Sequence, residues 1–340
     1  MAVIGELVAV SPVEHTMGGA LAEYLSIKMH HLIEPFTWRR ITVLGGYDRQ
    51  AVQSLREKRD KHFNWQRPTA EPIGDEILLK CFPGYDYVKH YGLITKTYLA
   101  LFGDADTEVV VVEPSEAACR SAIEPIDLDC RSAEVVIVGW GLHQLAGPDG
   151  WTNGATMSWK RETLLGRVVL WVGFHYSIWG DIAGRIVTRL AQDGARAVVY
   201  IGKVGGLRPG YLPNGQLASG SASMLSRQRV EWDDWFADAA FGDDVIRGLH
   251  ITSPSILLET KPWLSLQTYG DFVDPEIGHM GLAATRAGIQ FGYLHIISNN
   301  LTREFDHSLA NERRGDVVAR RAELLTAISG YLRGQIQRSN

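Results

Sequence analysis

The sequence predicts an α/β protein, because short apolar runs alternate with helical patterns along its 340 residues. The runs at 109–112, 135–138 and 197–201 are almost entirely apolar, as expected of strands that are buried on both faces. The composition agrees with a packed protein, because 45% of the residues are hydrophobic and only 21% are charged, which excludes a disordered chain.

The individual elements follow from these patterns in chain order. Strands are expected where apolar runs end at glycine, proline or a Ser-Asn pair, at 41–44, 109–112, 135–138, 167–172, 197–201 and 294–297. Helical patterns cover 48–61, 181–192, 274–288 and 304–332. The helix over 274–288 has a clear start, since Asp274 suits the N-cap and Pro275 suits the first helical position.

Charge and cysteine content narrow the function classes. The formal net charge of -5 argues against nucleic acid or an anionic membrane as the main partner. Cys81, Cys119 and Cys130 form no CxxC pair, so neither a disulfide framework nor a zinc site is indicated. No secretory signal is read at the N-terminus and no apolar stretch reaches about 18 residues. We therefore expect a cytoplasmic protein that binds no metal.

A glycine-rich segment at 202–207 follows a buried strand. It is not a P-loop, because Ala197 and Val204 stand where that motif needs a glycine and a Ser or Thr. Two interpretations stay open: a tight exit from the strand, or a turn whose backbone N–H groups approach an anion or a sugar.

Polar residues in two places suggest a binding site. Asp274 and Glu276 can each cap the helix that follows them, but a carboxylate can also accept hydrogen bonds from the two hydroxyls of a ribose. Asn299 ends a strand, where α/β folds place ligand contacts, and Arg313 lies on the helix predicted next. His295 lies in an apolar strand, where a histidine is more often a core residue than a catalyst.

Three sequence blocks together resemble the nucleoside phosphorylase superfamily, which includes purine nucleoside phosphorylases, uridine phosphorylases and methylthioadenosine nucleosidases. The first block is 194–207 with 214–217, which is similar to the family's strand and glycine-rich turn. The second is 272–276, where the family has V-[ED]-M-E, and the third is 294–300, where it has [IV]-S-D. The resemblance covers about 155–335.

The resemblance implies roles for particular residues. Glu276 would bind the ribose 2′- and 3′-hydroxyls, and Asp274 would line the region between sugar and base. Asn299 would hydrogen-bond the base, as in the trimeric 6-oxopurine phosphorylases, where other members carry an acidic Asp. Ser298 precedes this position, and Arg313 would tune it.

The departures from the family pattern concern phosphate. Tyr200 stands where the hexameric phosphorylases have their phosphate-binding Arg, and Lys203 replaces the Ser or Thr of the turn. The turn then offers only backbone N–H groups, Gly205 among them, and one lysine. Pro275 replaces the methionine under the ribose, and 176–178 replaces the family's G-M-G. These losses favour water as the nucleophile, whereas Lys203 could still serve phosphate or an acidic group on the substrate.

We therefore expect a nucleoside-phosphorylase-like mixed sheet flanked by helices over 131–340, behind an N-terminal α/β extension over 1–130. The expected activity is cleavage of the N-glycosidic bond of a nucleoside-like metabolite, by a hydrolase or by a phosphorylase of the glycosyltransferase class. The alternative is a scaffold kept for ligand binding or for a different reaction. Family members build their sites at dimer interfaces, so we expect a homodimer or a multiple of it. No cofactor is expected, and phosphate is a candidate second ligand.

Overall fold

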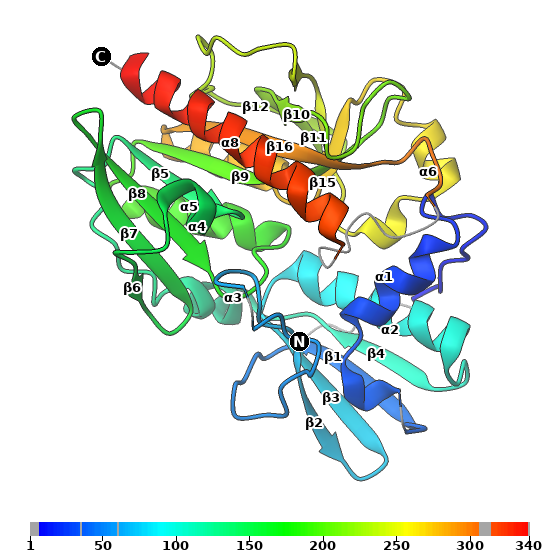
Figure 1. Ribbon diagram of the computed structural model, residues 1–340. Coiled ribbons are helices and arrows are strands. Elements are labelled where there is room, and N and C mark those ends of the chain that lie inside the picture. The colour runs from blue at the N-terminus through cyan, green and yellow to red at the C-terminus, as the bar shows by residue number, and fades with distance from the viewer. Residues whose placement is uncertain (1–6, 35, 60, 306–313, 339–340) are drawn as a thin grey trace.

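The computed structural model describes residues 7–34, 36–59, 61–305 and 314–338. Within these residues, two sheets with flanking helices form the molecule, as Figure 1 shows. The predicted α/β class is confirmed, and so is a mixed sheet flanked by helices behind an N-terminal α/β segment.

The smaller sheet lies in the N-terminal part and has the strand order β2-β3-β1-β4. Strand β1 pairs in parallel with β3 and β4, whereas β2 is antiparallel to β3. Pro72 lies in β2, an edge strand, where a missing N–H is tolerated. Helix α2 packs on this sheet and α1 packs on α2. The elements of this part are α1 (Ala20–Lys28), η1 (His31–Ile33), β1 (Arg40–Gly45), β2 (Thr69–Ile73), β3 (Glu76–Cys81), α2 (Tyr85–Phe102), β4 (Glu108–Val112) and α3 (Glu116–Ile123).

The larger sheet has twelve strands within the described residues and contains parallel and antiparallel pairs. Its centre is the parallel set β16-β9-β5-β8. The strands are β5 (Val135–Gly139), β6 (Thr152–Asn153), β7 (Met157–Leu164), β8 (Arg167–Phe174), β9 (Ala197–Gly206), β10 (Leu217–Ser219), β11 (Ala222–Leu225), β12 (Gln228–Glu231), β13 (Val245–Arg247), β14 (His250–Thr252), β15 (Phe272–Asp274) and β16 (Gln290–Asn300).

Helices cover both faces of the larger sheet. Helices α5 and α7 pack together on one side, while α8 crosses the other side beside α4 (Figure 1). No described helix is both long and apolar enough to span a bilayer. The helices here are α4 (Leu142–Ala146), α5 (Asp181–Gln192), η2 (Ile256–Leu258), α6 (Lys261–Ser265), α7 (Ile277–Ala287) and α8 (Gly315–Arg338).

Strand β5 shows why the central strands are apolar throughout. Val136 and Val138 point into the core under α5 and α7, whereas Val135 and Ile137 point into the core under α8. Successive side chains of a strand face opposite ways, so burial on both faces requires an unbroken apolar run. The strands predicted at 41–44, 109–112, 135–138, 167–172, 197–201 and 294–297 are all confirmed. The run at 109–112 is not buried on both faces as predicted, because β4 is an edge strand and only Val111 is fully buried in it.

The core under α5 and α7 continues into the smaller sheet. Ile41 and Val43 of β1 belong to the same apolar cluster as Val136 of β5 and Ile182 of α5. The division of the chain at 130/131 stays a prediction, since the two sheets are separate but their side chains share this cluster.

Two predicted elements are wrong. The helix predicted over 48–61 is not present in its described residues, because Val52 exchanges backbone hydrogen bonds of 2.9 Å with Ala70 and so joins the edge of the smaller sheet. The glycine-rich segment 202–207 does not turn, because Gly205 and Gly206 stay in β9 and pair with β15 on one side and β16 on the other. Tertiary pairing thus overrides the local pattern in both places.

The two later helices begin beyond their predicted starts. Helix α7 starts at Ile277 rather than at Pro275, and α8 starts at Gly315 rather than near Glu304. Asp274 nevertheless caps α7 as predicted. Its Oδ1 accepts hydrogen bonds from the N–H of Glu276 at 2.8 Å and from the N–H of Ile277 at 2.9 Å.

Candidate functional site

A cavity of about 240 Å³ lies between the end of the larger sheet and the N-terminal segment. Strand β9, the junction of β15 and α7, and the end of β16 form one wall, while α1 and the segments around Trp179 and Glu259 form the other. Its volume lies just below the usual range for small-molecule sites, roughly 300–1,000 Å³.

The structure brings together most of the residues predicted from the sequence. Those lining the cavity are Tyr200, Lys203, Gly205, Asp274, Glu276, Ser298 and Asn299. Arg313 lies outside the described residues. Ser177 and Ile178, which replace part of the family's G-M-G, also line it. These residues come from separate elements, so the sequence pattern identified positions that meet only in the folded chain.

The main role of Asp274 is structural. Besides capping α7, its Oδ1 lies 3.1 Å from Nε2 of His250, and its Oδ2 lies 3.6 Å from Nδ1 of His295. Burial alone would raise the pKa of Asp274, but His250, His295 and the N–H of Ile277 outweigh it and lower the pKa. Burial also lowers the pKa of His295 to about 3, so this histidine is a neutral core residue, as predicted. Asp274 is thus an ionised cap at the base of the cavity.

Glu276 is the carboxyl that remains available to a ligand. Only 7% of the residue is exposed, and the carboxyl accepts a hydrogen bond from the backbone of Gly180. Burial, followed by repulsion from Asp274, raises the pKa of Glu276 well above its ordinary range. A ligand that donates hydroxyl hydrogen bonds to this carboxyl would favour its ionised form and lower that pKa.

Two neighbouring asparagines at the end of β16, Asn299 and Asn300, differ in their hydrogen bonding. The pairing of β16 with β9 shifts between Ile297 and Asn299, so Ser298 lies in an irregular step of the ladder. Ser298 Oγ donates to the carbonyl of Val204 at 3.2 Å. Asn300 is fully used, because its Nδ2 donates to two loop carbonyls and its Oδ1 accepts from Thr302. Among the described residues, the Asn299 side chain has no hydrogen-bond partner, so it is free to meet a ligand.

Glycine at 205 leaves room for that asparagine. A Cβ placed there would lie 2.6 Å from Cδ1 of Leu301 and 3.1 Å from Oδ1 of Asn299. The glycine therefore serves close packing at the cavity wall. Because it is paired in β9 on both sides, the segment does not form the anion-binding turn considered from the sequence.

Two side chains of β9 give the cavity aromatic and basic character. Tyr200 is buried with its ring edge-on to His295, at 4.5 Å between ring centroids, and burial raises its pKa well above the ordinary range. Lys203 places its ammonium 5.3 Å from the ring of Trp140. Burial, and then repulsion from Arg321 and other basic groups, lower the pKa of Lys203 well below its usual range.

Several residues of the cavity escaped prediction. Most of them lie outside the three blocks, and the N-terminal ones lie in a part with no family resemblance. The polar and aromatic ones are Thr16, Tyr24, Lys28, Asn64, Trp140, Trp179, Glu259, Asn300, Arg303, Phe305 and Arg321. Two of them had a signal in the sequence: Trp140 follows the strand predicted at 135–138 and the glycine that ends it, and Asn300 lies in the third block.

Within the described part of the chain, no group of three or more His, Cys, Asp or Glu side chains is arranged to hold a metal ion. The three cysteines are buried and unpaired.

No known protein family profile matches the chain. A curated relative, the oxidoreductase cns1 of Cordyceps militaris, is 23% identical over 356 residues, which cover 92% of this chain and 44% of that protein. The chain therefore spans less than half the length of this relative.

Solved structures similar to the chain include three enzymes. The purine nucleoside phosphorylase of Schistosoma mansoni in complex with inosine is 15% identical and has a TM-score of 0.48. The match covers 65% of this chain and 94% of the phosphorylase chain. Futalosine hydrolase of Helicobacter pylori is 12% identical, with coverages of 61% and 98% and a TM-score of 0.47. The methylthioadenosine/S-adenosylhomocysteine nucleosidase of Campylobacter jejuni is 11% identical, with coverages of 61% and 99% and a TM-score of 0.46.

Proposed function

We propose that this chain hydrolyses the N-glycosidic bond of a nucleoside-like metabolite bound in the cavity. The observation that carries the proposal is the meeting of Glu276 and Asn299 at one cavity, since each has hydrogen-bonding capacity left for a ligand. They come from the two sequence blocks that in the resembled family contact the sugar and the base.

The two residues would act on different parts of the ligand. Glu276 would accept hydrogen bonds from two sugar hydroxyls and so hold the sugar in one orientation. When the bond between C1′ and the base nitrogen breaks, its electron pair moves to the base. A water oxygen forms the new bond to C1′, and the proton that this water loses ends on the base. Asn299 would stabilise the departing base by a hydrogen bond, but an amide cannot supply the proton that the base finally takes.

The conformation of β9 supports water over phosphate as the nucleophile. A phosphorylase must surround a phosphate dianion with several donors and a fixed positive charge. Gly205 and Gly206 remain paired between two strands, and Tyr200 presents a neutral hydroxyl where the resembled phosphorylases have an arginine. Apart from Lys203, strand β9 therefore offers few donors for a free phosphate under the sugar.

A screen of nucleosides and nucleotides for base release, with and without inorganic phosphate, tests the proposal. We expect release from at least one compound without phosphate, and an acceleration of no more than about twofold when phosphate is added. Strict dependence on phosphate, with sugar 1-phosphate as the product, would replace hydrolysis by phosphorolysis.

A second proposal is that the scaffold binds such a ligand without cleaving its glycosidic bond, or carries out a different reaction on it. It is favoured by the similarity to a protein named an oxidoreductase, and by an amide, Asn299, where many members of the resembled family have an acid. Tight binding of a nucleoside or nucleotide with no base release in the same screen would select this second proposal.

A further inference from the structure

Glu259 is a buried carboxyl that reaches the cavity without a partner. It follows η2, lines the cavity and is only 4% exposed. Among the described residues, no hydrogen bond or ion pair reaches its carboxyl. A buried polar group without a partner is costly, and a ligand that bonds to it recovers part of that cost. The carboxyl is therefore a candidate contact for a ligand in the cavity.

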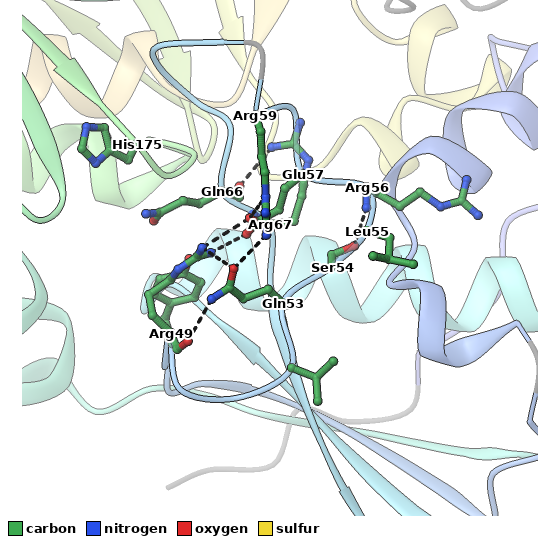
Figure 2. Close-up of polar contacts among 12 residues, drawn as sticks. Arg49, Gln53, Ser54, Leu55, Arg56, Glu57, Arg59, Gln66, Arg67 and His175 are labelled. Carbon is green, nitrogen blue, oxygen red and sulfur yellow. Dashed lines mark hydrogen bonds and ion pairs between the residues drawn. The ribbon is translucent and has the colours of Figure 1, made fainter.

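Buried carboxylates elsewhere in the chain have partners. Figure 2 shows Glu57 in the loop between β1 and β2, where its carboxylate pairs with Arg49 and Arg59. Asp234 is also buried, and it pairs with Arg247. A positive charge thus accompanies the buried carboxylate in both places, whereas the carboxyl that faces the cavity has no such charge beside it among the described residues.

The backbone on either side of Glu259 is fixed by the N-terminal segment. Thr16 donates to the Glu259 carbonyl twice, from Oγ1 at 2.8 Å and from its N–H at 3.3 Å. Two residues further on, the N–H of Lys261 donates to the carbonyl of Glu14 at 2.7 Å. A carboxyl on a segment held in this way is oriented before a ligand arrives, which is what a reacting group requires.

The neutral form of Glu259 makes it a proton donor. Burial, and then repulsion from the Asp274 carboxylate, raise the pKa of Glu259 well above its ordinary range. A protonated carboxyl has an O–H donor that a carboxylate lacks. Asp274 and Glu259 thus have opposite protonation states, and this pattern separates an acid from a permanently charged group.

The cleavage proposed above needs an acid, and the residues predicted from the sequence do not supply one. Among the described residues, three carboxyls line the cavity, those of Glu259, Asp274 and Glu276. Asp274 is ionised and committed to the cap of α7, whereas Glu276 would accept hydrogen bonds from the sugar. Asn299 is an amide and has no acidic proton to give. Glu259 is the carboxyl that remains.

We propose that Glu259 is the general acid of the cleavage, a role that falls to a segment outside the three sequence blocks. The inference rests on the proposed function. As the bond between C1′ and the base nitrogen breaks and its electron pair moves to the base, the O–H bond of Glu259 breaks and its proton joins the base. The water that adds to C1′ releases a proton to solvent. The Glu259 carboxylate takes up a proton from solvent, so the acid is restored and the overall reaction consumes one water.

Exchanging the carboxyl for an amide removes the acid and keeps the shape of the side chain. With the substrate found in the screen, kcat/KM of Glu259→Gln should fall by at least about 100-fold, since general acids contribute roughly 10²–10⁴-fold. Asp234→Asn is the matched control, because it makes the same exchange at a buried carboxyl beside Phe291, at the opposite end of β16 from Asn299. Its kcat/KM should stay within about twofold of wild type. Thermal unfolding shows that both variants are folded.

Substrates whose leaving group needs no proton separate an acid from a structural role. A para-nitrophenyl riboside releases a stable phenolate, and a nucleoside whose base is methylated to a cation releases a neutral base. On such a substrate, Glu259→Gln should keep its kcat/KM within about fivefold of wild type. A loss of equal size on all substrates would overturn the proposal, because it would show that the variant disturbs the cavity as a whole.

The infrared spectrum provides a readout that depends on no substrate. The difference spectrum between wild type and Glu259→Gln at neutral pH should contain the C=O stretch of a protonated carboxylic acid. Bands of a carboxylate alone would overturn the proposal, because an ionised Glu259 has no proton to donate.

A lysine in the same cavity is the rival donor. The Lys28 ammonium lies 5.6 Å from the centroid of the Tyr24 ring, and both residues line the cavity. Any loss of kcat/KM in Lys28→Met should be the same for substrates that need a proton and for those that do not. A loss confined to substrates that need a proton would assign the proton to Lys28 and overturn the role of Glu259.

The outcomes distinguish this inference from the proposed function. Base release by the wild type that Glu259→Gln does not slow would overturn the acid and leave the proposed function standing. No base release from any nucleoside or nucleotide would contradict the proposed function itself, and the acid role would fall with it.

Discussion

Asp274 and Glu276, which are separated by one residue at the start of α7, have different roles. Asp274 accepts hydrogen bonds from two backbone N–H groups and faces two histidines, whereas Glu276 keeps capacity for a ligand. Residue type and spacing could not assign these roles in advance, because either side chain can cap a helix. The difference arises from His250 and His295, which lie on other strands and face Asp274.

Removing the Glu276 carboxyl should reduce catalysis with little effect on stability. Glu276→Ala leaves two sugar hydroxyls unpaired in a dry cavity, so we expect kcat/KM to fall by roughly 30- to 1,000-fold, equivalent to about 2–4 kcal/mol. Glu276→Gln keeps one acceptor and should lose less. Steady-state kinetics on the substrate found in the screen measures both. Wild-type turnover by a folded Glu276→Ala protein would contradict the assignment.

Removing the Asp274 carboxyl should instead reduce stability. Asp274→Ala deletes the cap of α7 and the carboxylate that lies 3.1 Å from Nε2 of His250, so the free energy of unfolding should fall by about 1–3 kcal/mol. Asp274→Asn keeps a capping oxygen and should lose less. Urea unfolding measures both variants, and an unchanged midpoint for Asp274→Ala would show that the cap is dispensable.

Glu259 should make the stability of the protein depend on pH. Burial, and then Asp274, raise its pKa well above the ordinary 4.5, so the folded chain keeps a proton that the unfolded chain loses. This stabilising contribution is complete below about pH 4.5 and is lost as the pH rises towards the folded pKa. Glu259→Gln cannot titrate, so its stability relative to wild type should increase over that window, by at most about 1.4 kcal/mol per pH unit.

Urea unfolding of Glu259→Gln and wild type at several pH values from about 5 to 8 checks this expectation. A difference in the free energy of unfolding that stays constant over the range would show that Glu259 titrates normally.

At the scale of elements, the sequence predicted the strands and helices that have a long and regular pattern of apolar residues. The buried central strands and α5 follow directly from unbroken or periodic apolar residues. Strands of three or four residues, such as β10 and β14, were missed because so short a segment shows no period. Residues 48–61 were mistaken for a helix, since their pairing with Ala70 is a tertiary contact that no local pattern contains.

The contact of α5 with α7 should be sensitive to a single methyl group. A Cβ at Gly184 would lie 2.8 Å from the backbone oxygen of His279, so Gly184→Ala must separate the helices and should cost about 1–3 kcal/mol. Gly334→Ala is the matched control, because nothing lies within 4 Å of its added Cβ. It should stabilise α8 by up to about 1 kcal/mol. Chemical unfolding compares them, and equal effects would refute the close approach.

At the scale of the whole molecule, the assembly stays a prediction that derives from the resembled family. We expect a homodimer or a multiple of it, so light scattering should find particles heavier than the 37.7 kDa chain. A single species of that mass at working concentration would show that the chain acts alone.

The candidate site was predictable only where it coincides with the three sequence blocks. Those blocks located Glu276, Ser298 and Asn299, which line the cavity. Lys28 and Glu259 were not found, because their role depends on how the N-terminal segment packs against the larger sheet. A side chain becomes part of a cavity through neighbours far along the chain, and one sequence does not reveal those neighbours.

The cavity takes Lys28 from α1 and Arg321 from α8, so its walls come from segments that are far apart along the chain. During synthesis the N-terminal wall leaves the ribosome long before the C-terminal one, and the nascent chain has no complete cavity until α8 has emerged. Assembly of the cavity is thus among the last events of folding, since contacts between distant segments form slowly. A ligand that contacts both walls would hold the α1 and α8 segments together and protect the finished protein from unfolding and degradation.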